Sequence, residues 1–247
     1  PIRWCSGQAP ANPEGAEGDD AVMDVMRLAR KKFFGMVEDP KNWNVQTRCT
    51  EWEVRDLVGH MIDVTEGYLG RWDAAQKGEA PGALGLQVMG ETLNDHALDF
   101  RKLSREEAIA RLREDAARMD AIFQSLTPEQ WTGFLVTHPY MGAVPAGFYP
   151  AFHIMDYGIH PYDIEYGLGD KLAEIDEASA GILIPYCFII MQYTVDQSPA
   201  QGVEAAYGID VSGGWGGQWR APGQDGQVSG VPDPSGARGR HAVLRAP

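Results

Sequence analysis

Several features that define other classes of protein are missing from this sequence of 247 residues. It has only three cysteines, Cys5, Cys49 and Cys187, which lie far apart and include no Cys-x-x-Cys pair. The sequence therefore predicts neither a disulfide framework nor a structural zinc knuckle. Unpaired thiols of this kind are typical of a reducing compartment, so we expect a cytoplasmic protein.

Long hydrophobic runs are also absent. The longest, residues 182–191, is interrupted by Pro185 and is much shorter than the roughly 20 apolar residues that cross a bilayer. No basic segment leads into an apolar one near the amino end, so we expect no signal peptide. A membrane is accordingly not expected among the partners of the protein.

Basic residues are few. The chain has 21 Lys and Arg against 35 Asp and Glu, which gives a formal net charge of −14. Such a chain repels a phosphate backbone, and we expect a small-molecule substrate and no nucleic acid. The composition, with 44% hydrophobic and 23% charged residues, is that of a globular protein and leaves the oligomeric state open.

What the sequence does contain is a succession of amphipathic patterns, in which apolar residues recur at steps of three and four. These patterns predict helices over residues 20–37, 51–76, 104–126, 146–160 and 176–194, with a weaker segment over 87–101. Thr50 with Glu53, and Ser104 with Glu107, have the spacing of capping boxes. Pro145 is expected in the first turn of the helix that follows it. The fold class predicted is mainly α.

Composition divides the chain into three parts. Residues 1–16 have no periodicity and are predicted to be a loose leader. Residues 17–170 are expected to form a helical bundle, and residues 171–247 a carboxy-terminal helix with a small irregular or α+β tail. Within that tail, residues 207–219 alternate apolar with small or polar residues and contain two glycine pairs, the pattern of a short hairpin.

Four polar side chains follow one another at steps of three, four and three residues: His153, Asp156, His160 and Asp163. At about 100° per residue, they fall within an arc of about 80° on one side of a helix. Asp156 and His160 lie one turn apart and can converge on one metal ion. His60, at the border of the apolar face of the second predicted helix, is the candidate for a third ligand. Two imidazoles and one carboxylate leave positions on an ion open, as in catalytic sites.

Each of these histidines has a simpler interpretation, as a solvated residue or as a core residue paired with a carboxylate. Several polar side chains on the inner face of a bundle are unfavourable unless something binds them, which favours a metal site. Spacing alone leaves both interpretations open. Among the other candidates, His96 is expected to be solvated, and His138 lies in a predicted loop. Cys49 is interpreted as a small buried residue rather than a nucleophile, because nothing nearby in sequence lowers its pKa.

Two motifs resemble a known family. Residues 47–60, TRCTEWEVRDLVGH, resemble the signature of the DinB-like superfamily, specifically the branch of mycothiol-dependent maleylpyruvate isomerase. Residues 153–164, HIMDYGIHPYDI, resemble that family's carboxylate-x-x-x-His element followed by an aromatic-Asp-apolar triplet. The two motifs together anchor a resemblance over roughly residues 20–170, and residues 207–220 resemble the start of the smaller second domain found in this branch.

The resemblance implies a four-helix bundle in which His60, Asp156 and His160 hold a divalent metal near one end. Zinc is the metal implied most often, and nickel or iron suits the same ligands. Asp163, and also His153, are then expected to support the ligands or line the pocket. Arg220 is the candidate for contact with an anionic substrate or cofactor, with a surface arginine as the alternative.

The activity implied is that of a metal-dependent isomerase or S-transferase. A low-molecular-weight thiol such as mycothiol, activated at the metal, attacks a small electrophilic substrate. A metal-dependent hydrolase, or a non-catalytic protein that binds a metal or ligand, is the alternative.

Three features depart from the family pattern. Asp156 stands where glutamate or histidine is more usual, and its shorter side chain requires a closer approach of the helix to the ion. Pro161 directly follows a proposed ligand and predicts a kink there. Residues 222–247 do not resemble the rest of the family's second domain, so substrate-binding residues expected from it have no assigned position.

Overall fold

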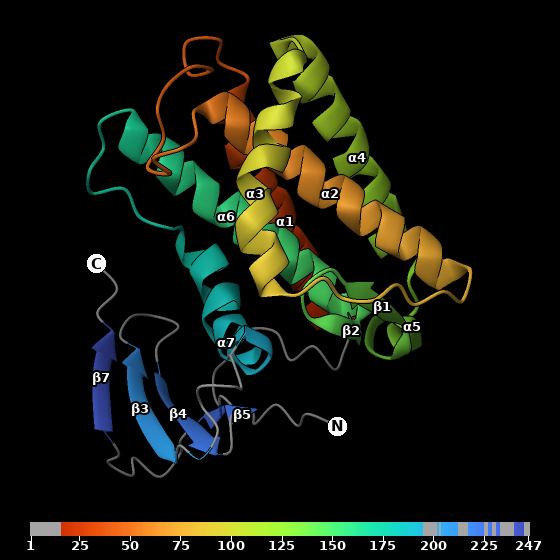
Figure 1. Ribbon diagram of the computed structural model, residues 1–247, viewed down its shortest axis with the longest axis vertical. Coiled ribbons are helices and arrows are strands. Elements are labelled where there is room, and N and C mark those ends of the chain that lie inside the picture. The colour runs from red at the N-terminus through yellow and green to blue at the C-terminus, as the bar shows by residue number, and fades with distance from the viewer. Residues whose placement is uncertain are drawn as a thin grey trace. The chain divides into compact units, whose positions relative to one another are not determined.

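The protein was analysed as a computed structural model, which describes residues 16–194, 202, 204–211, 217–224, 227–228, 231–232 and 240–244 (Figure 1). The chain forms two compact units, one of which is Val22–Ile175, while the other contains the residues from Asp176 onward. All but the last position of the leader predicted over residues 1–16 lies outside the described residues. Among the helices described, none is both long and apolar enough to cross a bilayer.

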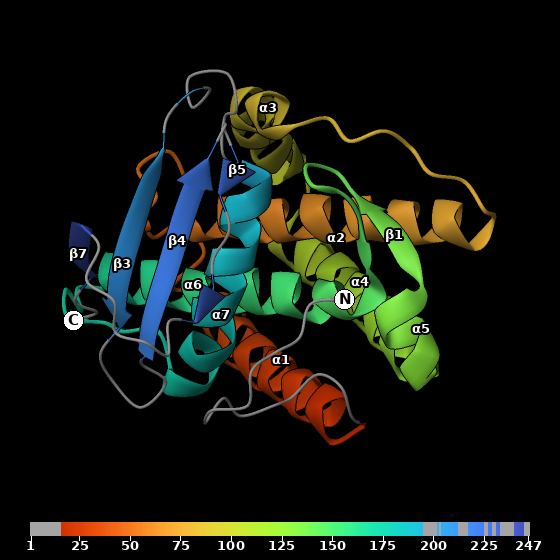
Figure 2. The same ribbon diagram turned by 90° about the horizontal axis from the view of Figure 1, so that it is seen from below.

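The first unit is a helical bundle. Its long helices are α1 (Ala16–Val37), α2 (Val54–Gln76), α3 (Leu86–Asp99), α4 (Arg105–Ser125) and α6 (Tyr149–Gly167). Four of them, α1, α2, α4 and α6, pack lengthwise (Figures 1 and 2). Their apolar faces meet in a core that includes the fully buried side chains of Phe33, Leu57, Leu112 and Tyr157, one from each helix. The predicted fold class, a mainly α protein with a four-helix bundle, is confirmed.

The amino ends of α2 and α4 are fixed by capping boxes, which satisfy backbone N–H groups that have no partner within the helix. The box predicted for α4 is present, since the backbone N–H of Ser104 donates to Glu107 Oε2 at 2.9 Å. The box predicted for α2 at Thr50 is wrong. There, Glu53 is the capping residue and its N–H donates to Asp56 Oδ2 at 2.8 Å, so the helix begins at Val54.

The segment between α4 and α6 holds more structure than the loop that the sequence predicts. It contains α5 (Pro128–Gly133) and an antiparallel hairpin of β1 (Leu135–His138) and β2 (Gly142–Pro145), followed by the 3-10 turn η2 (Ala146–Phe148). Another 3-10 turn, η1 (Phe100–Lys102), follows α3. Gly142 at the hairpin turn has φ +80°, a conformation that favours glycine.

Two predictions about prolines in and before α6 need correction. Pro145 ends β2 instead of starting the helix, and Pro150 occupies the first turn of α6. The helix also continues to Gly167 with Pro161 inside it, beyond the predicted end at residue 160. Pro161 removes one backbone donor, but the buried Ile164 and the bond from Leu168 N–H to the Ile164 carbonyl (2.9 Å) keep the last turns helical.

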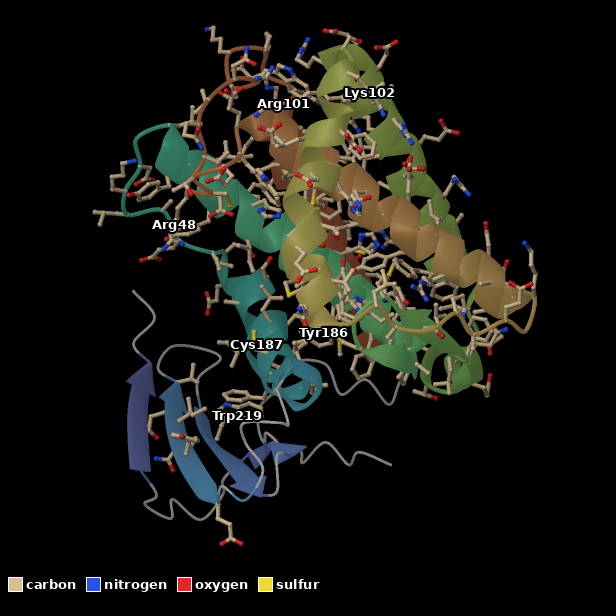
Figure 3. The ribbon with its side chains drawn as sticks, viewed as in Figure 1. Arg48, Arg101, Lys102, Tyr186, Cys187 and Trp219 are labelled. Atoms are coloured by element: carbon tan, nitrogen blue, oxygen red, sulfur yellow. The ribbon has the colours of Figure 1, made fainter. Side chains whose placement is uncertain are left out.

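The second unit combines one helix with a small sheet. Its elements are α7 (Glu177–Thr194), β3 (Ala205–Val211), β4 (Gly217–Gln224), β5 (Gln227–Val228), β6 (Val231–Pro232) and β7 (Arg240–Leu244). The hairpin predicted over 207–219 is confirmed, because β3 and β4 pair antiparallel with Ile209 opposite Trp219. In Figure 3 Trp219 lies beside α7, and its ring stacks on Phe188 with centroids 4.5 Å apart.

Candidate metal centre

Three of the residues predicted from the sequence meet between two helices. His60 comes from α2, whereas Asp156 and His160 come from successive turns of α6. One ligand atom from each residue lies within 4.8 Å of the other two. His60 Nε2 faces Asp156 Oδ1 at 3.7 Å, and the two imidazole rings meet edge to face with centroids 5.3 Å apart. These three residues are named the metal trio below.

Burial and charge both act on the trio. The side chains of His60, Asp156 and His160 are 9%, 14% and 11% exposed. Burial raises the pKa of the Asp156 carboxyl. The facing imidazole of His60, together with the nearby His160 and His153, lowers this pKa by more than burial raises it, so the net pKa lies below its ordinary value. Asp156 is therefore an anion at neutral pH, the form in which a carboxylate binds a metal ion.

Close helix packing places His60. The preceding residue, Gly59, faces α3, and a Cβ atom built there would lie 2.4 Å from the backbone oxygen of Ala97. Only glycine permits this approach without displacement of the backbone. Leu57, Val58 and Met61 of the same helix are buried in the core and fix the rotation of α2. The helix thus presents His60 towards α6.

Asp163 lies beside the trio on the last turns of α6. Its Oδ2 atom is 3.0 Å from His160 Nδ1. A carboxylate only accepts hydrogen bonds, so Nδ1 carries a proton, and in the neutral imidazole the lone pair is then on Nε2. This is the arrangement by which a carboxylate orients a histidine that binds a metal through its other nitrogen.

His153 has a different environment from the other residues on its face of α6. It is 1% exposed, its ring stacks on Tyr157, and it meets Tyr68 and Phe123 edge to face. Burial, with a smaller contribution from Arg30, lowers the pKa of His153 to about 3. The geometry thus separates His153 from the metal trio and places it, uncharged, in the aromatic core.

Sequence reasoning missed two residues of the segment that precedes α2. The indole of Trp52 covers the trio, with ring centroids 5.0 Å from His60 and 6.5 Å from His160, and its Nε1–H donates to Asn94 Oδ1 at 2.7 Å. Cys49 lies close to His160 and Asp163. Burial and then Asp163 raise the pKa of the Cys49 thiol to about 11. Both residues belong to the motif at 47–60, but that motif does not indicate what they contact.

The remaining candidates lie elsewhere. His96 is exposed on α3, with Nδ1 3.5 Å from Asp63 Oδ2. His138 belongs to strand β1 rather than to a loop, because it pairs with Gly142 of β2. Its ring is buried against Phe152, with centroids 4.3 Å apart. The backbone of Arg220 forms part of β4, but its side chain lies outside the described part of the structure, so the prediction of a substrate contact stays a prediction.

The four-helix bundle, with two imidazoles and a carboxylate converging between α2 and α6, defines the class as a helical-bundle protein with a candidate metal centre. Residues 27–165 match the family model of the mycothiol maleylpyruvate isomerase N-terminal domain. The chain belongs to this family.

Solved structures agree on the fold. The crystal structure of the mycothiol-dependent maleylpyruvate isomerase is similar over 78% of this chain and 75% of that one, with a TM-score of 0.55 and 17% identity. A histidine-to-alanine mutant of that isomerase is similar over 77% of this chain and 75% of that one, with a TM-score of 0.56 and 16% identity. No curated protein matches the sequence.

One neighbour corrects an expectation. The colibactin self-resistance protein ClbS, solved in complex with double-stranded DNA, is similar over 62% of this chain and 96% of that chain, with a TM-score of 0.53 and 15% identity. A protein of this fold therefore binds DNA. The prediction that nucleic acid is excluded as a partner, which was based on the net charge, was wrong. The physical reason is that a net charge sums the whole chain and does not describe how charge is distributed over its surface.

Proposed function

We propose that this protein is a metal-dependent enzyme that uses a low-molecular-weight thiol, such as mycothiol, as the nucleophile in isomerisation or S-transfer of a small electrophilic substrate. Membership of the isomerase family supports the reaction class. The observation that carries the proposal is the convergence of His60, Asp156 and His160 on one position.

The residues of the trio fit a divalent ion. His60 Nδ1 is buried without a hydrogen-bond partner among the described residues, and Nε2 is 3.7 Å from Asp156 Oδ1, longer than a hydrogen bond. Nitrogen and oxygen ligands of a tetrahedral zinc ion stand about 3.3 Å apart when their bonds are about 2.0 Å long. Small movements of the side chains would therefore bring the trio to bonding distance. The ligands suit zinc, and nickel or iron as well.

A divalent ion held by three protein ligands would supply Lewis acidity, which lowers the pKa of a thiol and raises its thiolate fraction at neutral pH. The residues of the chain prepare this position. Asp156 provides a negative charge, and Asp163 holds the His160 proton on Nδ1 so that Nε2 is free. Trp52 packs against the two imidazoles, with ring centroids 5.0 Å and 6.5 Å away.

The thiolate accounts for both reaction types. In an isomerisation, its sulfur adds to an activated cis double bond, rotation occurs about the resulting single bond, and elimination of the thiolate gives the trans product. In an S-transfer, the adduct takes up a proton and is released. An unsaturated dicarboxylate is the substrate class with which to begin, because its carboxyl groups activate the double bond for addition.

The metal assignment is tested by elemental analysis of the purified wild type, His60→Ala and His160→Ala. His96→Ala is the matched control, since His96 is exposed on α3. We expect about one metal ion per chain in the wild type and the control, and much less bound metal in both trio variants, because each lacks one of the three ligands. Metal content that is the same in all four proteins would show that the site assignment is wrong.

The thiol dependence is tested separately, by following consumption of an unsaturated dicarboxylate with and without added thiol and identifying the products by mass spectrometry. Conversion that requires the thiol supports the proposal. Hydration or hydrolysis without thiol would indicate a hydrolase instead. A protein that retains its metal and binds thiol, but converts none of a panel of unsaturated acids, would be a non-catalytic binder.

A further inference from the structure

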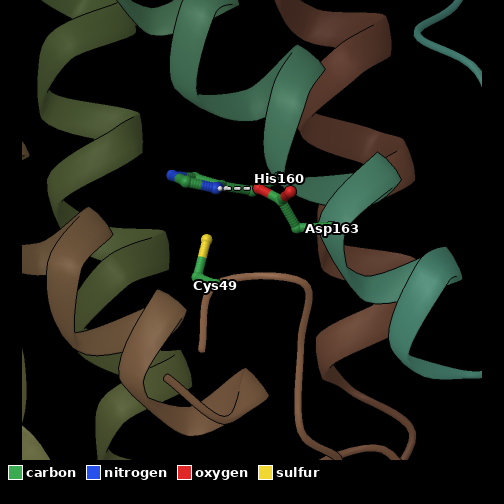
Figure 4. A group of neighbouring side chains, drawn as sticks. All are labelled: Cys49, His160 and Asp163. Atoms are coloured by element: carbon green, nitrogen blue, oxygen red, sulfur yellow. Dashed lines mark hydrogen bonds and ion pairs between the residues drawn. The ribbon is translucent and has the colours of Figure 1, made fainter. Parts of the chain in front are cut away.

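His160 belongs to a second group of potential ligands besides the trio. One ligand atom each from Cys49, His160 and Asp163 lies within 4.8 Å of the other two. Figure 4 shows the sulfur of Cys49 directed towards the His160 ring and the Asp163 carboxylate. The carboxylate contacts Nδ1, whereas Nε2 is the nitrogen left for the trio. One imidazole can therefore serve both groups through its two nitrogens, with Nδ1 on the side of Asp163.

Cys49 is held in place by backbone hydrogen bonds. Its N–H donates to Thr47 Oγ1 at 3.2 Å, and its carbonyl accepts from the N–H of Trp52 and the side-chain amide of Gln46, each at 2.9 Å. A residue with both backbone groups paired has little freedom to turn away. The segment that precedes α2 thus fixes the backbone of Cys49 and the direction of its Cα–Cβ bond.

The same segment is joined directly to α6. The N–H of Arg48 donates to the Asp163 carbonyl at 3.0 Å. A Cβ atom at Gly167 would lie 2.2 Å from the Gln46 carbonyl oxygen, so a glycine is required where the helix passes this segment. These contacts bring sulfur, nitrogen and oxygen together without any ion, and preorganised ligands bind a metal more tightly.

We propose that Cys49, His160 and Asp163 form a second metal site, which binds a thiophilic divalent ion such as zinc or cadmium through the thiolate, Nδ1 and the carboxylate. The site goes beyond the proposed function, which requires only the trio. Binding releases the thiol proton and the Nδ1 proton to solvent. His160 would then contribute a nitrogen to each of the two sites, and the sulfur ligand would make the second site the softer of the two.

The test titrates the metal-free full-length protein with Cd²⁺ and measures the ions bound per chain together with the ultraviolet sulfur-to-cadmium charge-transfer band. We expect two ions and a band in the wild type. Cys49→Ser is expected to bind one ion and lose the band, whereas Cys187→Ser, the matched control on α7, keeps both. Asp156→Ala, which removes a trio ligand, is expected to bind one ion and keep the band.

The outcomes separate this site from the trio. One ion without a band in the wild type, or a band that survives Cys49→Ser, would overturn the second site and leave the trio intact. Loss of the band in Cys187→Ser would assign the sulfur to the other unit and also overturn it. A measurement that needs no variant is alkylation of the wild type, in which bound Cd²⁺ should protect Cys49 at least tenfold; equal alkylation with and without the ion contradicts the proposal.

Discussion

The Nδ1 atom of His160 lies 3.0 Å from Oδ2 of Asp163, and this contact occupies one of the two nitrogens of the imidazole. With the proton on Nδ1, the lone pair of Nε2 is available to an ion. Asp163, which is not a member of the trio, therefore controls how well His160 binds an ion there. The first prediction follows from that contact.

Asp163→Asn is expected to weaken metal binding by the trio about 10- to 100-fold, because the neutral amide lacks the negative charge that strengthens the hydrogen bond from His160 Nδ1–H. Competition with a chelator of known affinity measures the change. Glu165→Gln is the matched control, because Glu165 lies on the same helix but pairs with Lys32. Equal affinity in Asp163→Asn and the wild type would mean that the hydrogen bond does not orient the ligand.

Trp52 is expected to report on metal binding. Its indole lies 5.0 Å from the His60 ring, so an ion bound there changes the polarity and charge next to the fluorophore. Zinc added to the metal-free protein should change the tryptophan emission of the wild type, and Trp52→Phe should remove most of that change. Trp131→Phe, which alters a tryptophan of α5, should leave it in place. A zinc response that survives in Trp52→Phe would place the ion elsewhere.

The stability of the metal-free protein should fall in acid because of two buried histidines. Burial lowers the pKa of His153 to about 3 and that of His138 to about 4, against 6.5 for both without burial. Each therefore contributes stability that is fully present above pH 6.5 and is lost as pH falls towards those lowered values. Between pH 6 and pH 4.5 the loss approaches about 1.4 kcal/mol per pH unit per histidine.

Urea unfolding of the wild type and His138→Phe over this pH range tests the assignment. The variant loses the contacts of His138 with Tyr68 and Tyr140, so the slopes of stability against pH are compared rather than the stabilities themselves. His138→Phe should show a flatter slope, and His96→Ala, an exposed control, the slope of the wild type. Identical slopes in all three proteins would show that His138 does not resist protonation.

Gly167→Ala is expected to disturb the site from outside it. The added Cβ would lie 2.2 Å from the Gln46 carbonyl, so the segment that carries Cys49 and Trp52 must shift. We expect a loss of about 1–3 kcal/mol in the free energy of unfolding, with weaker metal binding. Gly70→Ala on α2 meets nothing within 4 Å and should be neutral or slightly stabilising. Thermal unfolding and chelator competition measure both effects.

The periodicity of apolar residues was enough to predict the long helices, because each buries one face in a common core. It failed where elements are short. The four-residue strands β1 and β2 have too few residues to show a period, and their pairing depends on a turn at Gly142. The start of α2 was misplaced because Thr50 and Glu53 both have capping partners three residues on, and local spacing does not choose between them.

The part of the candidate site that lies on one helix could be predicted from the spacing of its residues. Asp156 and His160 are one turn apart, and the structure places them together with His60. His153 shares their face, but it lies seven residues before His160, about 10 Å along the helix axis, too far to share an ion. Cys49 and Trp52 belong to a segment without periodicity, so only the folded chain reveals what they touch.

Pro161, between the last trio ligand and Asp163, has a consequence for metal selectivity. Because it lacks an N–H group, the Tyr157 carbonyl loses the helical bond that would otherwise stiffen the turn carrying both α6 ligands. A turn that is short of one bond bends at lower energetic cost. We expect Asp156 and His160 to adjust their spacing to ions of different radius, which leaves discrimination among metals to ligand softness and to cellular supply.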